Sequence, residues 1–125
     1  MAKRVLDVGN CGPDFMSIRS FLTRTLSCEV EQVDDAAGAF AALKRQAFDL
    51  VLVNRKLDVD YSDGIDVIRA LKADPATATV PVMLVTNYPE HQEVAVAVGA
   101  LPGFGKLEFG KQETRDRLTA VLGDA

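Results

Sequence analysis

Three polar residues that follow short apolar runs are the best candidates for chemistry in this 125-residue sequence. Asn54, Thr86 and Lys106 each stand where an apolar segment ends. A hydroxyl group and an ammonium group at one site suit contacts to an anion such as a phosphoryl group. The amide of Asn54 is uncharged, and no carboxylate stands beside these residues in sequence. The set therefore predicts anion contacts without an acidic partner.

The apolar runs before these residues predict buried β-strands. Residues 50–53 are four consecutive apolar residues, two of them β-branched, which indicates a strand covered on both faces. Residues 28–33 are more polar and alternate in part, as is typical of an edge strand. Five strands are expected, over residues 4–8, 28–33, 49–54, 80–85 and 101–105.

Helical periodicity and capping residues fill the segments between the strands. Five helices are expected: one with Pro13 in its first turn, one capped by Asp34 or Asp35, one capped by Asp63, one over residues 90–98 and one over residues 111–122. Five alternations of strand and helix predict a doubly wound α/β fold, with a parallel sheet and helices on both faces. In such a sheet the carboxyl ends of the strands share one rim, where ligands bind.

The bulk composition excludes several classes of protein. Apolar residues make up 48% and charged residues 26%, which is ordinary for a soluble globular protein. A net charge of −4 with scattered basic residues argues against nucleic-acid binding. No apolar run is long enough to span a membrane, and Asp7 interrupts the first one, so no signal peptide is expected. We expect a cytoplasmic single domain over residues 1–125, with Cys11 and Cys28 as free thiols.

The order and spacing of the motifs resemble the receiver domain of bacterial two-component response regulators, over essentially the whole chain. The matching segments are residues 49–53, Asp63-Gly64, residues 80–82 with Thr86, Gly99-Ala100 and residues 104–106. The resemblance implies a flavodoxin-like, five-stranded parallel sheet in the strand order 2-1-3-4-5.

The resemblance also implies which positions form the site. In that family an aspartate at the end of the third strand accepts a phosphoryl group. Two acidic residues after the first strand help it to hold Mg²⁺, and a Thr or Ser and a Lys contact the phosphoryl oxygens. By position the acceptor falls on Asn54, the acidic pair on Gly9 and Asn10 (or on Asn10 and Cys11, if the turn is shifted by one residue), and the phosphoryl contacts on Thr86 and Lys106.

None of the positions that should carry a carboxylate has one. A neutral amide does not form an acyl phosphate as a carboxylate does, and Mg²⁺ prefers anionic oxygen ligands. We therefore expect no enzyme activity, no metal and no cofactor. Two further departures from the family pattern are Gly103, where an aromatic residue usually changes rotamer, and Leu107, where proline is usual.

These features predict a pseudo-receiver, a non-catalytic module that acts by protein–protein interaction independent of phosphorylation. The family's usual interaction face would be formed here by the helix over residues 90–98, the strand over 101–105 and the last helix. Its expected members are Tyr88, His91, Val94, Ala95, Pro102, Phe104 and Arg115, and it would bind a protein partner or a second copy of the chain. Two alternatives are phosphotransfer through Asp58 or Asp60, and an anion or small-ligand sensor at the rim.

Several single residues have competing interpretations. We expect Lys106 to bond the rim amides rather than extend into solvent, whereas Thr86 is equally suited to capping nearby backbone and to binding an anion. Asp7 is expected to have a structural role at a strand edge, beside a basic group or in protonated form. His91 is expected to be exposed and Cys11 to be an ordinary thiol. Asp58, Asp60 and Asp63 are interpreted as loop charge and helix capping rather than a Ca²⁺ site.

Overall fold

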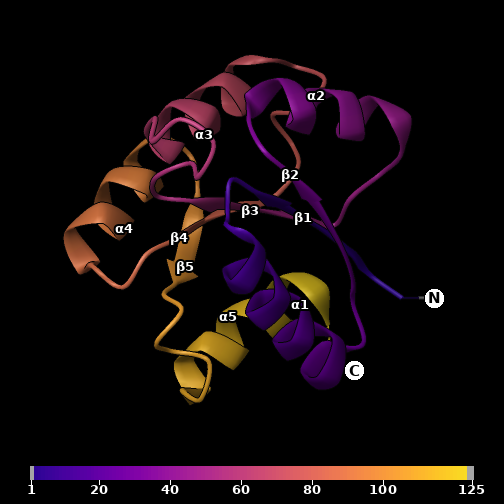
Figure 1. Cartoon of the computed structure of the whole chain (residues 1–125), viewed down its shortest axis with the longest axis vertical. Coiled ribbons are helices and arrows are strands. Elements are labelled where there is room, and N and C mark those ends of the chain that lie inside the picture. The colour runs from indigo at the N-terminus through magenta and orange to yellow at the C-terminus, as the bar shows by residue number, and fades with distance from the viewer. Residues whose placement is uncertain (1, 124–125) are drawn as a thin grey trace.

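The computed structural model describes residues 2–123 and confirms the predicted alternation of strands and helices (Figure 1). In chain order the elements are β1 (Arg4–Val8), α1 (Gly12–Leu26), β2 (Glu29–Val33), α2 (Ala36–Arg45), β3 (Leu50–Asn54), α3 (Gly64–Ala73), β4 (Val82–Val85), α4 (Pro89–Ala97), β5 (Leu101–Phe104) and α5 (Gln112–Leu122). None of the helices in this part of the chain combines the length and apolar character needed to cross a lipid bilayer.

The five strands form one parallel sheet in the order β2-β1-β3-β4-β5, as predicted. In register, Val8 at the end of β1 pairs with both Val33 of β2 and Val53 of β3, and Asn54 pairs with Val85 of β4. The carboxyl ends therefore lie along one edge of the sheet, which we call the rim.

Helices cover both faces of the sheet (Figure 1). On one face α2, α3 and Ala95 of α4 pack against residues such as Leu6 and Val51. On the other face α1 and α5 pack against residues such as Leu52 and Phe104. Alternate residues of each strand enter opposite layers, which is why residues 50–53 are all fully buried.

The observed boundaries differ from the predicted ones by one or two residues. β4 begins at Val82 because Pro81 has no N–H to give to the sheet. α4 begins at Pro89, since proline suits the first helical position. Asp35 caps α2 by accepting from the Gly38 N–H, and Asp63 caps α3 by accepting from the Ile65 N–H, as predicted.

The pairing of β4 with β5 is irregular. Met83 pairs with Leu101 and Val85 pairs with Phe104, so two residues of β5 lie opposite the single residue Leu84. This bulge contains Pro102 and Gly103, a proline without an N–H and a glycine with a free choice of backbone angles. The regular pairing of β5 with β4 is therefore interrupted at Pro102 and Gly103, two residue types that are unfavourable inside a strand.

Candidate functional site

The rim brings Asn54, Thr86 and Lys106 to one pocket of about 200 Å³. This convergence agrees with the prediction from the strand ends. The lining residues are Asn54, Arg55, Lys56, Val85, Thr86, Asn87, Tyr88 and Lys106. None of these eight residues is acidic, whereas three are basic. Gly9 and Asn10 do not line the pocket.

Asn54 is partly buried at the end of β3, and its side chain is turned toward the following loop. Its Nδ2 donates a hydrogen bond of 2.6 Å to the backbone oxygen of Lys56. The Asn54 side chain thus donates its hydrogen bond to a loop carbonyl oxygen, an atom of a kind that can also bind a metal ion. The residue at the acceptor position therefore already has a partner within the loop.

Thr86 is buried, and its hydroxyl group contacts the start of α4. Its Oγ1 accepts from the Tyr88 N–H at 3.3 Å and lies 3.3 Å from Nδ1 of His91. This arrangement favours the interpretation that Thr86 caps nearby backbone. The prediction that His91 is exposed was wrong, because its ring is partly buried between Thr86 and the edge of the Tyr88 ring.

Lys106 does not bond the rim amides, so that prediction was wrong. Its Nζ donates 2.7 Å to Oδ2 of Asp14, in the first turn of α1. The hydrogen bond from Lys106 lowers the pKa of Asp14 below its usual value. A carboxylate thus lies beside the rim after all, supplied by a helix rather than by a strand end. The signal was Asp14 directly after Pro13, in the helical turn that follows β1.

Gly9 is packed closely against Leu57 and has a backbone angle that favours glycine. Its φ is +82°, and a Cβ built there would lie 2.3 Å from Cδ2 and 3.2 Å from Cα of Leu57. Its backbone links three segments, because its N–H donates to Val33 and its oxygen accepts from the Asp58 N–H. An acidic side chain at position 9 would need both a strained backbone and a displaced Leu57.

Asn10 is buried and faces the interior of the rim turn. Its Nδ2 donates to Oδ1 of Asp7, and its backbone oxygen accepts from Gln32. Asp7 is fully buried in β1, between β2 and β3, so it does not lie at a strand edge. Burial raises the pKa of Asp7 to about 6, although the hydrogen bond from Asn10 acts in the opposite direction. The contacts of both residues are those of a structural pair.

The remaining candidate residues are held by local contacts. Oδ1 of Asp60 accepts from the N–H and hydroxyl groups of Ser62. Within residues 2–123, no cluster of three or more His, Cys, Asp or Glu side chains is placed to hold a metal ion. Cys11 and Cys28 are free thiols, as predicted.

The residues predicted for the interaction face are exposed only in part. Tyr88 and Val94 are exposed large apolar residues, and Leu101 joins them. Phe104 was predicted to belong to this face, but it is fully buried against the α1–α5 layer, with its ring centroid 6.0 Å from that of Phe109. Ala95 is also buried, because it is the residue by which α4 packs on the core.

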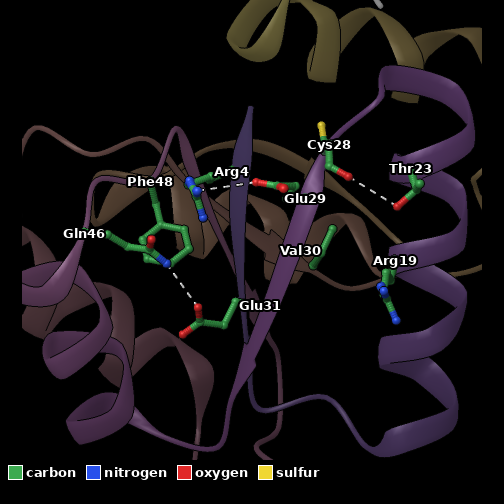
Figure 2. A pocket seen from close by; sticks show the side chains of 9 residues that line it. All are labelled: Arg4, Arg19, Thr23, Cys28, Glu29, Val30, Glu31, Gln46 and Phe48. Atoms are coloured by element: carbon green, nitrogen blue, oxygen red, sulfur yellow. Dashed lines mark hydrogen bonds and ion pairs between the residues drawn. The ribbon is translucent and has the colours of Figure 1, made fainter. Parts of the chain in front are cut away.

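A larger pocket, of about 450 Å³, lies along β2 at the opposite end of the strands (Figure 2). Arg4 and Glu29, the first residues of β1 and β2, form an ion pair there at 3.6 Å. Glu31 accepts from Gln46 at 3.2 Å. Three of the four charged residues that line this pocket, Arg4, Glu29 and Glu31, have ion-pair partners within the chain, so it offers no arrangement for chemistry comparable to the rim.

Comparison with known proteins gives a consistent result. A sequence profile of the family described as "Response regulator receiver domain" matches residues 14–120. A gliding motility regulatory protein of Myxococcus xanthus is 29% identical over 103 residues, which cover 78% of this chain and 13% of that protein. The chain therefore spans a small part of the length of this relative.

Solved structures agree with the fold. A putative response regulator from Chloroflexus aurantiacus J-10-fl has a TM-score of 0.82 at 18% identity and covers 98% of each chain. The receiver domain of a sensor histidine kinase from Pseudomonas aeruginosa PAO1, solved with magnesium coordinated in its active-site cleft, has a TM-score of 0.76 at 22% identity. It covers 99% of this chain and 100% of its own.

Proposed function

This chain belongs to the response regulator receiver domain family of two-component signalling, and we propose that it acts there by protein–protein binding without accepting a phosphoryl group. One observation carries the proposal: each polar residue that the family would use at the rim has a partner inside the chain. Asn54 bonds Lys56, Thr86 bonds the start of α4, and Lys106 pairs with Asp14.

The chemistry of the rim supports the same proposal. Phosphorylation of a receiver needs a carboxylate nucleophile and anionic ligands for Mg²⁺. The rim pocket is lined by no carboxylate, and a side chain at position 9 would need a strained backbone and a displaced Leu57. The match to the family profile begins at residue 14, so it leaves out β1 and the turn that contains Gly9 and Asn10.

The three basic residues of the rim pocket also make a small-anion sensor worth considering. The contacts at the rim argue against it. The ammonium group of Lys106 is held by Asp14, and the hydroxyl group of Thr86 is engaged with Tyr88 and His91. An anion would have to displace these internal contacts, so we propose the protein-binding function instead.

Incubation with acetyl phosphate and Mg²⁺ should add no phosphoryl group to the protein, as measured by intact-mass spectrometry. The Asn54→Asp variant should remain unmodified as well, because the turn after β1 still supplies no carboxylate to hold the metal. A phosphoryl adduct that disappears in Asn54→Ala would contradict the proposal. An adduct that disappears in Asp58→Asn or Asp60→Asn would show a non-standard acceptor.

The proposed binding surface is formed by α4, β5 and α5. Its exposed apolar residues are Tyr88, Val96 and Leu101, which are 58%, 44% and 40% exposed, and Arg115 adds a positive charge. Exposed apolar residues on one surface are a common feature of protein interfaces. We propose that this surface binds a signalling partner, and that a second copy of the chain is one such partner.

Val96→Asp should abolish self-association, as measured by sedimentation equilibrium, because Val96 lies one helical turn from Gln92 on the β5 side of α4 and a charge within an apolar contact is costly to desolvate. Val94→Asp is the matched control, since Val94 was predicted for this face and is exposed to a similar extent, 45%, but lies on the opposite side of the helix from Gln92. If the unaltered chain is monomeric at high concentration, the second-copy form of the proposal fails.

A further inference from the structure

The bulge in β5 leaves one backbone group to be satisfied from outside the sheet. Opposite Leu84, β5 contains Pro102, which has no N–H, and Gly103. The Gly103 N–H donates to Oε1 of Gln92, on α4, at 2.9 Å. A backbone group of the strand is therefore paired with a helix side chain.

Gln92 also bonds the neighbouring strand. Its Nε2 donates to the Leu84 oxygen at 2.9 Å and lies 3.4 Å from the Thr86 oxygen. A primary amide contains a donor and an acceptor, as a peptide group does. The side chain of Gln92 thus connects β4 to β5 in the way an additional peptide group would.

Gly103 is the residue that makes this connection possible. A Cβ at position 103 would lie 2.3 Å from the Leu84 oxygen and 3.2 Å from the amide atoms of Gln92. On its other side, the Gly103 oxygen accepts from Arg117 of α5 at 2.6 Å. The backbone at this residue is therefore held by α4 through its N–H and by α5 through its oxygen.

α4 has little apolar contact with the sheet. Among residues 89–97, Ala95 alone is buried, and the helix exposes Val94 and Val96. Burial of one alanine contributes far less than burial of the leucines and isoleucines that anchor α1 and α3. Directed hydrogen bonds from Gln92 consequently form a large share of what positions this helix.

We propose that Gln92 is a clasp that fastens α4 to β4 and β5 and holds the α4–β5–α5 surface in one arrangement. The arrangement of this surface then depends on this side-chain amide together with the contacts of Thr86 with Tyr88 and His91. That this surface binds a partner rests on the proposed function, whereas the clasp itself rests on the contacts of Gln92.

Amide hydrogen exchange measured by NMR tests the clasp. In Gln92→Ala the Gly103 N–H loses its acceptor, so its exchange should become about tenfold faster or more, relative to core amides of β1 and β3. Resonances of α4 should broaden in the same variant. Gln112→Ala is the matched control, because the amide of Gln112 bonds Asp116 within α5.

A second variant separates the two ends of the clasp. Gln92→Glu keeps an oxygen that can accept from Gly103 but cannot donate to Leu84, so Gly103 should stay protected while α4 loosens. Unchanged Gly103 exchange in Gln92→Ala, or equal loosening of α4 in Gln112→Ala, would overturn the clasp. The exchange rates of the core amides of β1 and β3 show whether a variant destabilises the whole fold. Phosphoryl uptake would overturn the proposed function and leave these exchange rates as predicted.

Discussion

Replacing Asp7 with asparagine is expected to stabilise the fold by about 3 kcal/mol near pH 8. Asp7 is fully buried, and its folded-state pKa of about 6 lies above the ordinary value of 3.8. This difference of about 2 pKa units means that folding disfavours the ionised form of Asp7, relative to the protonated form, by about 3 kcal/mol. An asparagine of nearly the same shape avoids the cost of a buried charge.

The direction of the pH effect follows from the raised pKa. The folded state binds the Asp7 proton more tightly than the unfolded state, so this contribution to stability is fully present below about pH 3.8. It is lost as the pH rises through about 6. The stability gained by Asp7→Asn should therefore be near zero at about pH 4 and near its maximum at about pH 8.

Urea unfolding of both proteins at the two pH values measures this difference. Asp58→Asn, at an exposed loop carboxylate, is the control and should change stability little at either pH. A gain from Asp7→Asn that is the same at both values would contradict the prediction, because it would mean that Asp7 does not change its charge in this range.

The contacts of Asn10 explain why an amide suits position 7. Among the described residues, Oδ2 of Asp7 and Oδ1 of Asn10 are buried without a hydrogen-bond partner. Both are acceptors that lack a donor. An asparagine at position 7 adds two hydrogens at this place, so it can reduce the number of unsatisfied buried atoms as well as remove the charge.

Replacing Gly64 with alanine is expected to destabilise the fold by about 3 kcal/mol, the upper end of the range for overpacking. A Cβ at this position would lie 2.0 Å from the Asn54 backbone oxygen and 3.0 Å from Cγ1 of Val53. Because the atom in the way belongs to the backbone of β3, no change of rotamer relieves the contact. The Gly64 N–H also donates to the Arg55 oxygen at 2.7 Å, which fixes its position.

Gly12→Ala provides the comparison for this substitution. Gly12 is likewise the first residue of its helix, but nothing lies within 4 Å of a Cβ built there. Alanine at position 12 should be neutral or slightly stabilising, since it favours the helix. Thermal unfolding should give a lower midpoint temperature for Gly64→Ala than for Gly12→Ala. Equal midpoint temperatures would contradict the prediction, because they would mean that β3 moves easily away from α3.

The sequence predicts the sheet and its rim well, because strand patterns and parallel topology are local and general properties. Asn54, Thr86 and Lys106 converge since each follows a strand, and strand ends meet at one edge. The pairing of Lys106 with Asp14 could not be predicted in the same way. Asp14 belongs to a helix 92 residues away in sequence, and its distance from the last loop depends on how that helix packs.

Phe104 and His91 show a second limit of sequence reasoning. The bulge at Pro102 and Gly103 fixes which side of the sheet Phe104 enters, and one residue more or less in a strand reverses that side. His91 looked exposed because its neighbours in sequence are polar. Its contact with Thr86 arises only when the first turn of α4 closes over the end of β4.

The close packing of Gly9 against Leu57 has a consequence for how this site can change over time. Any substitution at position 9 that restores an acidic side chain meets a backbone with φ of +82° and a filled volume. The side chain of Leu57 would have to move aside, and its Cα would still lie 3.2 Å from the new Cβ. A carboxylate at position 9 is therefore expected to destabilise the fold, so a single substitution there restores an acidic side chain only with a loss of stability.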